Sequence, residues 1–317
     1  MNDTAVALAS PASLRARLRA AWDGDVAWSF RHSPVAIGSL LVFLICVLAA
    51  LLAPWIAPHN PFDLRTLSLS ESLLPPAWSP GGKALFALGT DDQGRDVLSA
   101  IMFGARISLL VGIASVAFAI ILGVSLGLVA GYAGGKLDAF IMRVADVQLS
   151  FPAILIALLI DGVARVALPR GAHDQVALYV LVLAIGLSNW VQYARTVRGS
   201  TMVEKNKEYV QAARVIGVAP AGIMARHLLP NVLGPVLVLA TINIATAILT
   251  EATLSFLGVG VPPTEPSLGT LIRIGNEFLF SGEWWITIFP GAALVVMVLS
   301  INLLGDWLRD ALNPKLR

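Results

Sequence analysis

The sequence has few charged residues and a single cysteine. Asp, Glu, Lys and Arg make up 13% of the 317 residues and hydrophobic residues 57%, whereas a soluble domain carries about 25% charged residues. This deficit predicts a membrane protein. The lone thiol, Cys46, excludes an internal disulfide, and with four histidines it forms no metal-ligand spacing. A net charge of +2 is too small to favour binding to nucleic acid.

The sequence also lacks the motifs of common catalytic sites. No G-x-x-x-x-G-K-[ST] phosphate loop is present, because Gly82-Lys83 and Gly135-Lys136 lack the upstream glycine and the following Ser or Thr. No G-x-S-x-G, H-E-x-x-H or paired-cysteine motif occurs either. We therefore expect no catalytic residue, metal site or cofactor in this chain, and no nucleotide hydrolysis by the chain itself.

Six runs with little or no charge are long enough to cross a bilayer as helices, which predicts an all-α polytopic fold. The runs cover residues 33–58, 107–135, 139–160, 175–194, 228–257 and 284–305. The third run is weaker: Arg143 and Asp146 lie near its start, where they can pair on one helix face, and Pro152 predicts a bend. In the second run, Gly123 and Gly127 begin a small-xxx-small pattern, typical of close helix packing.

The chain divides into four parts on this pattern. The parts are a cytoplasmic tail (1–32), the first span with an external segment (33–104), the main membrane domain (105–308) and a cytoplasmic tail (309–317). The N-terminal tail is either a disordered segment or a basic amphipathic helix on the membrane surface, since four apolar residues are spaced to share one helix face. These residues are Leu14, Leu18, Trp22 and Trp28.

The polar connections carry further predictions. Within residues 59–106, Asp96 lies near the start of an expected amphipathic helix, and the neighbouring acidic pairs are not expected to bind metal. Asp161 and Arg165 have the spacing of an exposed i,i+4 ion pair. Residues 258–283 are expected to form a polar loop.

The distribution of Lys and Arg predicts the orientation. With six spans and the N-terminus inside, the inner segments hold 15 of these residues and the outer segments 7. The positive-inside rule therefore places both termini and the 195–231 loop in the cytoplasm.

Residues 208–231 read as a helix, a turn and a second short helix. Ala212 and Ala213 favour a helix, Gly217 interrupts it, and Pro220 suits the first turn of the next helix. The segment is expected to end at Leu229-Pro230-Asn231, where the fifth span follows. A structured basic loop on one face of a membrane protein indicates a docking site for a soluble partner.

Two polar residues inside the fifth span have open interpretations. Glu251 lies near the outer end of the span and either lines a translocation path or is hydrogen-bonded at interface depth. Asn243 either lines a polar pore or holds helices together.

The 208–231 segment also carries a resemblance to a known family. QAARVIG, followed by Leu229-Pro230, resembles the EAA loop of permease subunits in binding-protein-dependent ABC importers, with Gln211 in place of the usual Glu. Further motifs resemble the dipeptide/oligopeptide permease family, in its second-permease ("C") branch, over residues 30–317. They are LGTDDQGRDVLS, FGARISLLVG, EYVQAAR, HLLPN, EATLSFLGVG, WWITIFPG and NLLGDWLRDALNPKLR.

The resemblance implies a type I ABC importer permease fold in a bacterial inner membrane. It implies a homologous second permease, two ABC ATPase subunits that bind ATP and Mg, and an external peptide-binding protein. The 208–231 loop would be a coupling helix, and Arg214 and Arg226 would contact the ATPase or, alternatively, anionic lipid. The implied coupling residues are Glu208, Gln211, Ala212, Ala213, Arg214, Gly217, Arg226 and Pro230.

Alternatives stay open on sequence alone. An importer of nickel, glutathione or opines would have the same fold and coupling loop. An ion-coupled secondary transporter is disfavoured because the spans lack chains of Asp, Glu and His. A membrane enzyme or assembly scaffold would need a site that the sequence does not contain.

Overall fold

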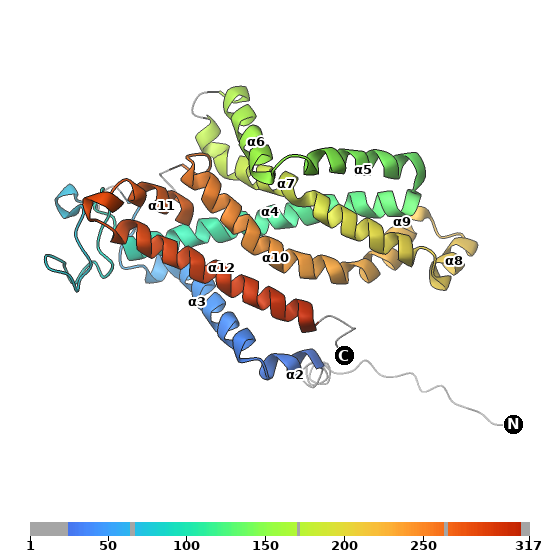
Figure 1. The fold of residues 1–317 in the computed structure, drawn as a ribbon, viewed down its shortest axis with the longest axis horizontal. Coiled ribbons are helices and arrows are strands. Elements are labelled where there is room, and N and C mark those ends of the chain that lie inside the picture. Colours follow the sequence, from blue (N-terminus) through green and yellow to red (C-terminus); the bar gives the residue numbers. More distant parts are fainter. Residues whose placement is uncertain (1–24, 64–66, 170–171, 263–265, 312–317) are drawn as a thin grey trace.

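The computed structural model describes residues 25–63, 67–169, 172–262 and 266–311, and in these residues every regular element is helical (Figure 1). The prediction of an all-α fold is confirmed. The elements are α2 Asp25–Arg31, α3 Pro34–Ile56, η1 Leu69–Glu71, α4 Val97–Ala133, α5 Gly135–Leu149, α6 Ala153–Ala167, α7 Ala172–Glu204, α8 Glu208–Val215, α9 Pro220–Ile223, η2 Met224–Leu228, α10 Leu229–Phe256, α11 Leu268–Asn276, η3 Leu279–Ser281 and α12 Trp285–Ala311.

Among the described residues, five helical segments are long and apolar enough to cross a membrane. The predicted third span is not one helix, because α5 and α6 meet at an angle of 94°. Counted as a single broken span, the pair brings the number to six. Pro152 explains the break, since it has no N–H to donate and disfavours a helical conformation at the residue before it.

Two ion-pair predictions are revised by the packing of α5 and α6. Asp146 pairs with Arg195 on α7 instead of Arg143 on its own helix. Asp161 does pair with Arg165, with Oδ2 at 2.6 Å from Nε, but Asp161 is buried and only the arginine is exposed. Asp146 therefore links α5 to α7, whereas the Asp161–Arg165 pair lies within α6.

The centre of the bundle is the contact between α4 and α7. A Cβ added at Gly123 would lie 2.5 Å from the carbonyl oxygen of Trp190, and one added at Gly127 would lie 2.6 Å from that of Ala194. These α4 glycines allow the two backbones to approach closely, as the small-xxx-small pattern predicts. A large core of apolar side chains from α4, α7, α8 and α10 surrounds this contact.

Helix α4 is longer than the span predicted within it. The Asp96 side chain accepts a hydrogen bond from Ser99 N and caps the helix, which then runs unbroken for 37 residues, or about 55 Å. The expected amphipathic helix and the second span are therefore one element. The apolar run marked only its membrane portion.

Helix α11 was not expected, since it lies in the predicted polar loop 258–283. Ser267 caps it, and Leu268 and Leu271 are buried. Gly269 packs against the backbone of α10, because a Cβ there would lie 2.4 Å from the carbonyl oxygen of Ala252. A helix of nine residues is marginal by itself, so its packing on α10 and α12 stabilises it.

The bundle has two distinct ends (Figure 1). The α8–α9 segment lies at one end, and α11 lies at the other with the residues that connect α3 to α4. The start of α3 is tied to the end of α12 through α2, where the rings of Phe30 and Trp307 are 5.1 Å apart. The predicted N-terminal amphipathic residues Leu14, Leu18 and Trp22 lie outside the described residues, whereas Trp28 is exposed on α2.

Candidate functional site

The 208–231 segment forms a hook at one end of the bundle (Figure 1). Helix α8 ends in a tight turn in which Gly217 N donates to Arg214 O and Val218 N donates to Ala213 O. This is the Schellman arrangement, and it places Gly217 in the left-handed region with φ +81°. The predicted helix, turn and helix are present, with a glycine at the position where the backbone requires it.

The second helix does not end at Leu229-Pro230, contrary to the prediction. Helix α9 continues through the π-helical turn η2 into α10, so residues 220–256 form one apolar helical segment. Leu229 N donates to the carbonyl oxygen of Met224, five residues earlier, and Pro230, which has no N–H, follows directly. The proline is accommodated by the wider turn and does not stop the helix.

The inner face of α8 is rigidly attached to the bundle. Val210 and Ala213 are buried and belong to the same apolar core as Val197 of α7, Ile223 of α9 and Leu228 of η2. A displacement of α8 must therefore move the ends of α7 and α10, because close-packed interiors transmit strain.

The tip of the hook is apolar and exposed. Val215 and Ile216 are 87% and 78% exposed, and Ala212 on the same helix is also exposed. The sequence pattern indicated the arginines of this loop as contact residues but not these two apolar residues. Their signal was two β-branched residues directly before Gly217, at the point where the helix ends.

The polar residues of the hook have mostly internal partners. Gln211 Nε2 donates to the carbonyl oxygen of Asn206 at 3.0 Å, a bond that a glutamate could not make. The Arg214 guanidinium lies 5.2 Å from the centre of the Tyr132 ring at the end of α4, within the range of a cation–π contact. Glu208 and Arg226 are exposed.

Tyr209 connects three helices at the base of the hook. Its hydroxyl donates to Glu204 Oε2 of α7 at 2.7 Å and accepts from Asn231 Nδ2 of α10 at 3.2 Å. Lys207 Nζ donates to the other Glu204 oxygen at 2.7 Å. Partial burial and the Glu204 carboxylate raise the pKa of Tyr209 to about 12, so the phenol stays a hydrogen-bond donor at neutral pH.

The two polar residues of the fifth span lie inside the packed bundle. Glu251 is fully buried; its Oε2 accepts from Ser108 Oγ of α4 at 2.8 Å and its Oε1 from Ser255 Oγ at 2.7 Å. The Ser108 hydroxyl also accepts from Leu268 N at the start of α11. In this structure the carboxylate faces hydroxyls of its own chain and not an open passage. Asn243 is likewise buried.

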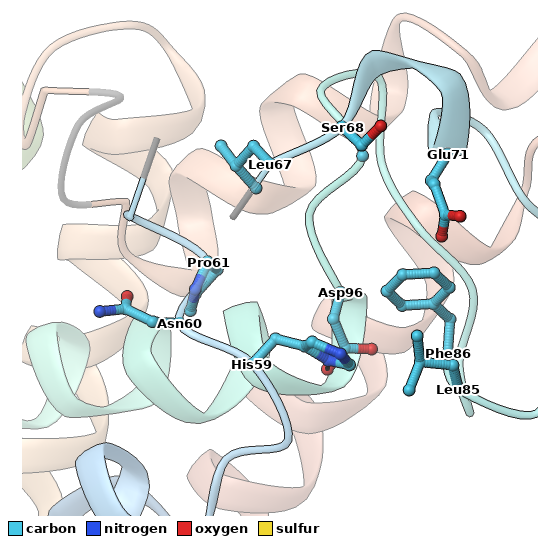
Figure 2. Close-up of a pocket in the computed structure, with 10 residues that line it drawn as sticks. His59, Asn60, Pro61, Leu67, Ser68, Glu71, Leu85, Phe86 and Asp96 are labelled. Atoms are coloured by element: carbon cyan, nitrogen blue, oxygen red, sulfur yellow. Dashed lines mark ion pairs between the residues drawn. The ribbon is translucent and has the colours of Figure 1, made fainter. Parts of the chain in front are cut away.

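Three neighbouring hollows lie at the opposite end of the bundle, and Asn60 lines each of them. Figure 2 shows the one next to His59 and Asp96, which has a volume of about 240 Å³. Asp96 Oδ1 and His59 Nδ1 are buried there without a hydrogen-bond partner, and His59 Nδ1 is 3.9 Å from Asp96 Oδ2. Among the described residues, no group of three His, Cys, Asp or Glu is arranged to hold a metal ion.

Comparisons with known proteins agree with the membrane fold. Residues 123–317 match a family described as the binding-protein-dependent transport system inner membrane component, and residues 21–76 match one described as the N-terminal TM domain of oligopeptide transport permease C. The chain is 40% identical over 289 residues to the di/tripeptide transport system permease protein DppC of Pseudomonas aeruginosa (strain UCBPP-PA14), covering 91% of both chains.

The chain is also similar to a second permease in sequence and to a solved transporter in fold. The dipeptide transport system permease protein DppC of Escherichia coli (strain K12) is 42% identical over 288 residues, again with 91% of each chain covered. A chain of the inward-facing MetNI methionine ABC transporter aligns with a TM-score of 0.53 over 68% of this chain and 96% of that chain, at 21% identity. At this identity the structural match concerns the fold alone.

Proposed function

Since the chain belongs to the family of binding-protein-dependent transport system inner membrane components, we propose that it is a permease subunit of an ATP-driven importer of dipeptides and oligopeptides. The relatives at 40% and 42% identity carry the names of di/tripeptide and dipeptide permeases. Their match extends over nine-tenths of the chain, which supports transfer of the peptide substrate class.

The observation that carries the proposal is the hook formed by α8, Gly217 and α9. It combines an apolar exposed tip at Val215 and Ile216 with a base buried in the core. An exposed apolar patch rimmed by polar residues is typical of a protein–protein contact. We assign the tip to the groove of an ABC ATPase, with Arg226 at its edge, and the buried base to the transmission of movement.

The mechanism follows from the two attachments of the hook. Closure of the ATPase subunits on ATP displaces α8, and the buried residues Val210 and Ala213 pass this displacement to α7 and α10 as a rigid-body movement. The bundle then alternates between access from each side. ATP and Mg are bound by the ATPase subunits, and this chain supplies no catalytic residue.

The assembly has partners of three kinds besides the lipid bilayer. These are a homologous second permease, two ABC ATPase subunits and an external binding protein that delivers the peptide. We place the complex in the inner membrane of a bacterium, with both termini and the hook in the cytoplasm. The four-part division at residues 32, 104 and 308 is retained as part of this proposal. Nickel, glutathione or an opine is the alternative substrate class.

Copurification and uptake test the proposal. The chain, expressed at native level with an affinity tag, should copurify with two nucleotide-binding subunits and a sister permease. The complex in liposomes, with binding protein outside and ATP inside, should accumulate labelled dialanine. Replacement of ATP by a non-hydrolysable analogue should abolish uptake. Recovery of the chain alone, or uptake driven by an ion gradient without ATP, would contradict the proposal.

A further inference from the structure

The largest of the three hollows lined by Asn60 has no role in the function proposed above. Its volume is about 640 Å³, within the range of small-molecule sites. It lies between the segment after α3, the outer part of α4 and the start of α7. Its lining residues are Asn60, Phe62, Phe103, Arg106, Ile107, Leu110 and Leu178.

Arg106 is the one charged residue in this lining. Its side chain is exposed, and no carboxylate among the described residues pairs with it, whereas Arg95 on the same side is paired with Asp91. Along α4 the residues from 107 to the end of the helix carry no charge, so Arg106 lies at the boundary of the membrane-spanning part. An arginine without a partner at a hollow keeps its fork of five N–H donors for a ligand.

The second polar side chain in the lining also donates. Asn60 Oδ1 accepts from Phe62 N at 3.1 Å, which leaves the amide NH₂ for another partner. Figure 2 shows the Asn60 amide pointing away from His59 and Asp96. The polar side chains of the hollow therefore offer donors, and donors without acceptors select an anionic oxygen group.

The rest of the lining is apolar. Phe62 and Phe103 meet edge to face with their ring centres 5.5 Å apart, and three aliphatic side chains complete the wall. Such a surface suits an anion attached to an apolar body better than a strongly hydrated inorganic ion. A peptide with a terminal carboxylate has this chemistry, and so does the phosphate of a lipid headgroup.

On the basis of the proposed peptide import, we propose that this hollow binds the terminal carboxylate of the incoming peptide through Arg106, with Asn60 as the second donor. The apolar lining receives the last side chain of the peptide. Arg106 is then a specificity-determining residue of the permease, separate from any selection by the external binding protein. The hollow shares Asn60 with the pocket of Figure 2, whose unpartnered acceptor Asp96 Oδ1 suits the opposite, cationic end of a longer peptide.

A protection experiment on the complete complex tests this assignment without the binding protein. Leu110, which is 46% exposed in the hollow, is replaced by cysteine (Leu110→Cys) in a chain whose own thiol is removed (Cys46→Ala). The rate at which a maleimide modifies the new thiol is measured in lipid nanodiscs, with dialanine or with dialanine amide. Dialanine should slow the reaction and the amide should not.

Substitution of the arginine gives the decisive comparison. Arg106→Gln should raise the dialanine concentration needed for half-protection by about 10-fold or more, as expected for loss of a charge-assisted bond to a carboxylate. Lys83→Gln is the matched control, since it removes a positive charge from the same end of the molecule without touching the hollow. It should leave protection unchanged.

Three outcomes would overturn the assignment. They are equal protection by dialanine and its amide, protection that survives Arg106→Gln, and no protection at any peptide concentration. A reaction rate that depends on Arg106 and on anionic phosphatidylglycerol, but not on peptide, would assign the hollow to a lipid headgroup instead. The proposed function fails separately, through absence of ATP-dependent uptake by the unaltered complex.

Discussion

At the scale of single residues, Gly217 shows how a backbone angle can matter more than space. A Cβ added at this position meets no heavy atom within 4 Å, so crowding does not demand a glycine. The φ of +81° does, because an L side chain in the left-handed region costs roughly 1–2 kcal/mol. The turn that presents Val215 and Ile216 therefore depends on this residue.

Gly217→Val should uncouple transport from ATP hydrolysis. The strained turn will relax and displace the apolar tip from the ATPase, so uptake falls several-fold per ATP hydrolysed while membrane insertion is unchanged. Gly199→Val is the control, since Gly199 also has no atom within 4 Å of an added Cβ but has no positive φ. Uptake and ATP hydrolysis are measured together in proteoliposomes, and normal coupling in Gly217→Val would refute the role of the turn.

Glu251 is a brace between helices in this structure. Glu251→Ala removes the acceptor of two buried hydroxyls, those of Ser108 and Ser255, and leaving a buried polar group unsatisfied costs about 1–3 kcal/mol. We expect a lower midpoint of thermal unfolding for the purified complex, and a smaller loss for Glu251→Gln, which retains an acceptor. The exposed Glu277→Ala should have no effect, and an unchanged midpoint in Glu251→Ala would contradict the brace.

At the scale of elements, the α4–α7 contact is the best-specified packing in the bundle. Gly127→Ala places a Cβ 2.6 Å from the carbonyl oxygen of Ala194, so the helices must separate. Overpacking of this kind costs about 1–3 kcal/mol and should lower the midpoint of thermal unfolding. Gly162→Ala on α6, where the added Cβ meets nothing within 4 Å, is the matched control. Equal midpoints for the two variants would show that the contact adapts freely.

Tyr209 links the hook to α7 and α10, and its removal tests that linkage. Tyr209→Phe loses the hydrogen bonds to Glu204 and Asn231, so uptake per ATP should fall while the ATPase subunits still bind. The pKa of Tyr209 is raised to about 12 from an ordinary value near 10. The neutral phenol is therefore favoured in the folded state, and its contribution is complete below about pH 10 and lost as the pH rises through 12.

The ratio of uptake between the native protein and Tyr209→Phe should consequently be constant from pH 6 to pH 9. A ratio that changes within this interval would show that another titrating group controls the linkage. The comparison uses the same proteoliposome preparation at each pH, so that the pH dependence of the ATPase subunits cancels.

At the scale of the whole molecule, the orientation in the membrane is testable by labelling. In a chain carrying Cys46→Ala, a membrane-impermeant maleimide should label Trp78→Cys in intact spheroplasts, since Trp78 is 64% exposed in the segment that connects α3 to α4. Val215→Cys should react only after the membrane is opened, because the proposed orientation puts the hook in the cytoplasm. The opposite pattern would reverse the orientation derived from the distribution of Lys and Arg.

The hook was visible in the sequence as a helix, a glycine and a second helix. Ala212, Ala213 and Gly217 are local signals of this structure, since helix propensity and left-handed turns depend on a few neighbouring residues. The sequence could not show that Val215 and Ile216 are exposed while Val210 is buried, because burial depends on which face of α8 meets α7 and α10.

The membrane class, the apolar runs and the small-residue face of α4 were determined by the sequence itself, because composition and spacing alone decide whether a segment favours lipid. Tertiary structure decided the rest. Pro152 marked the break between α5 and α6, but its angle of 94°, the continuation of α9 into α10 and the formation of α11 depend on packing partners distant in sequence. So do the partners of Asp146 and Glu251, since a charged side chain within a bundle pairs with whichever donor the neighbouring helices bring within reach.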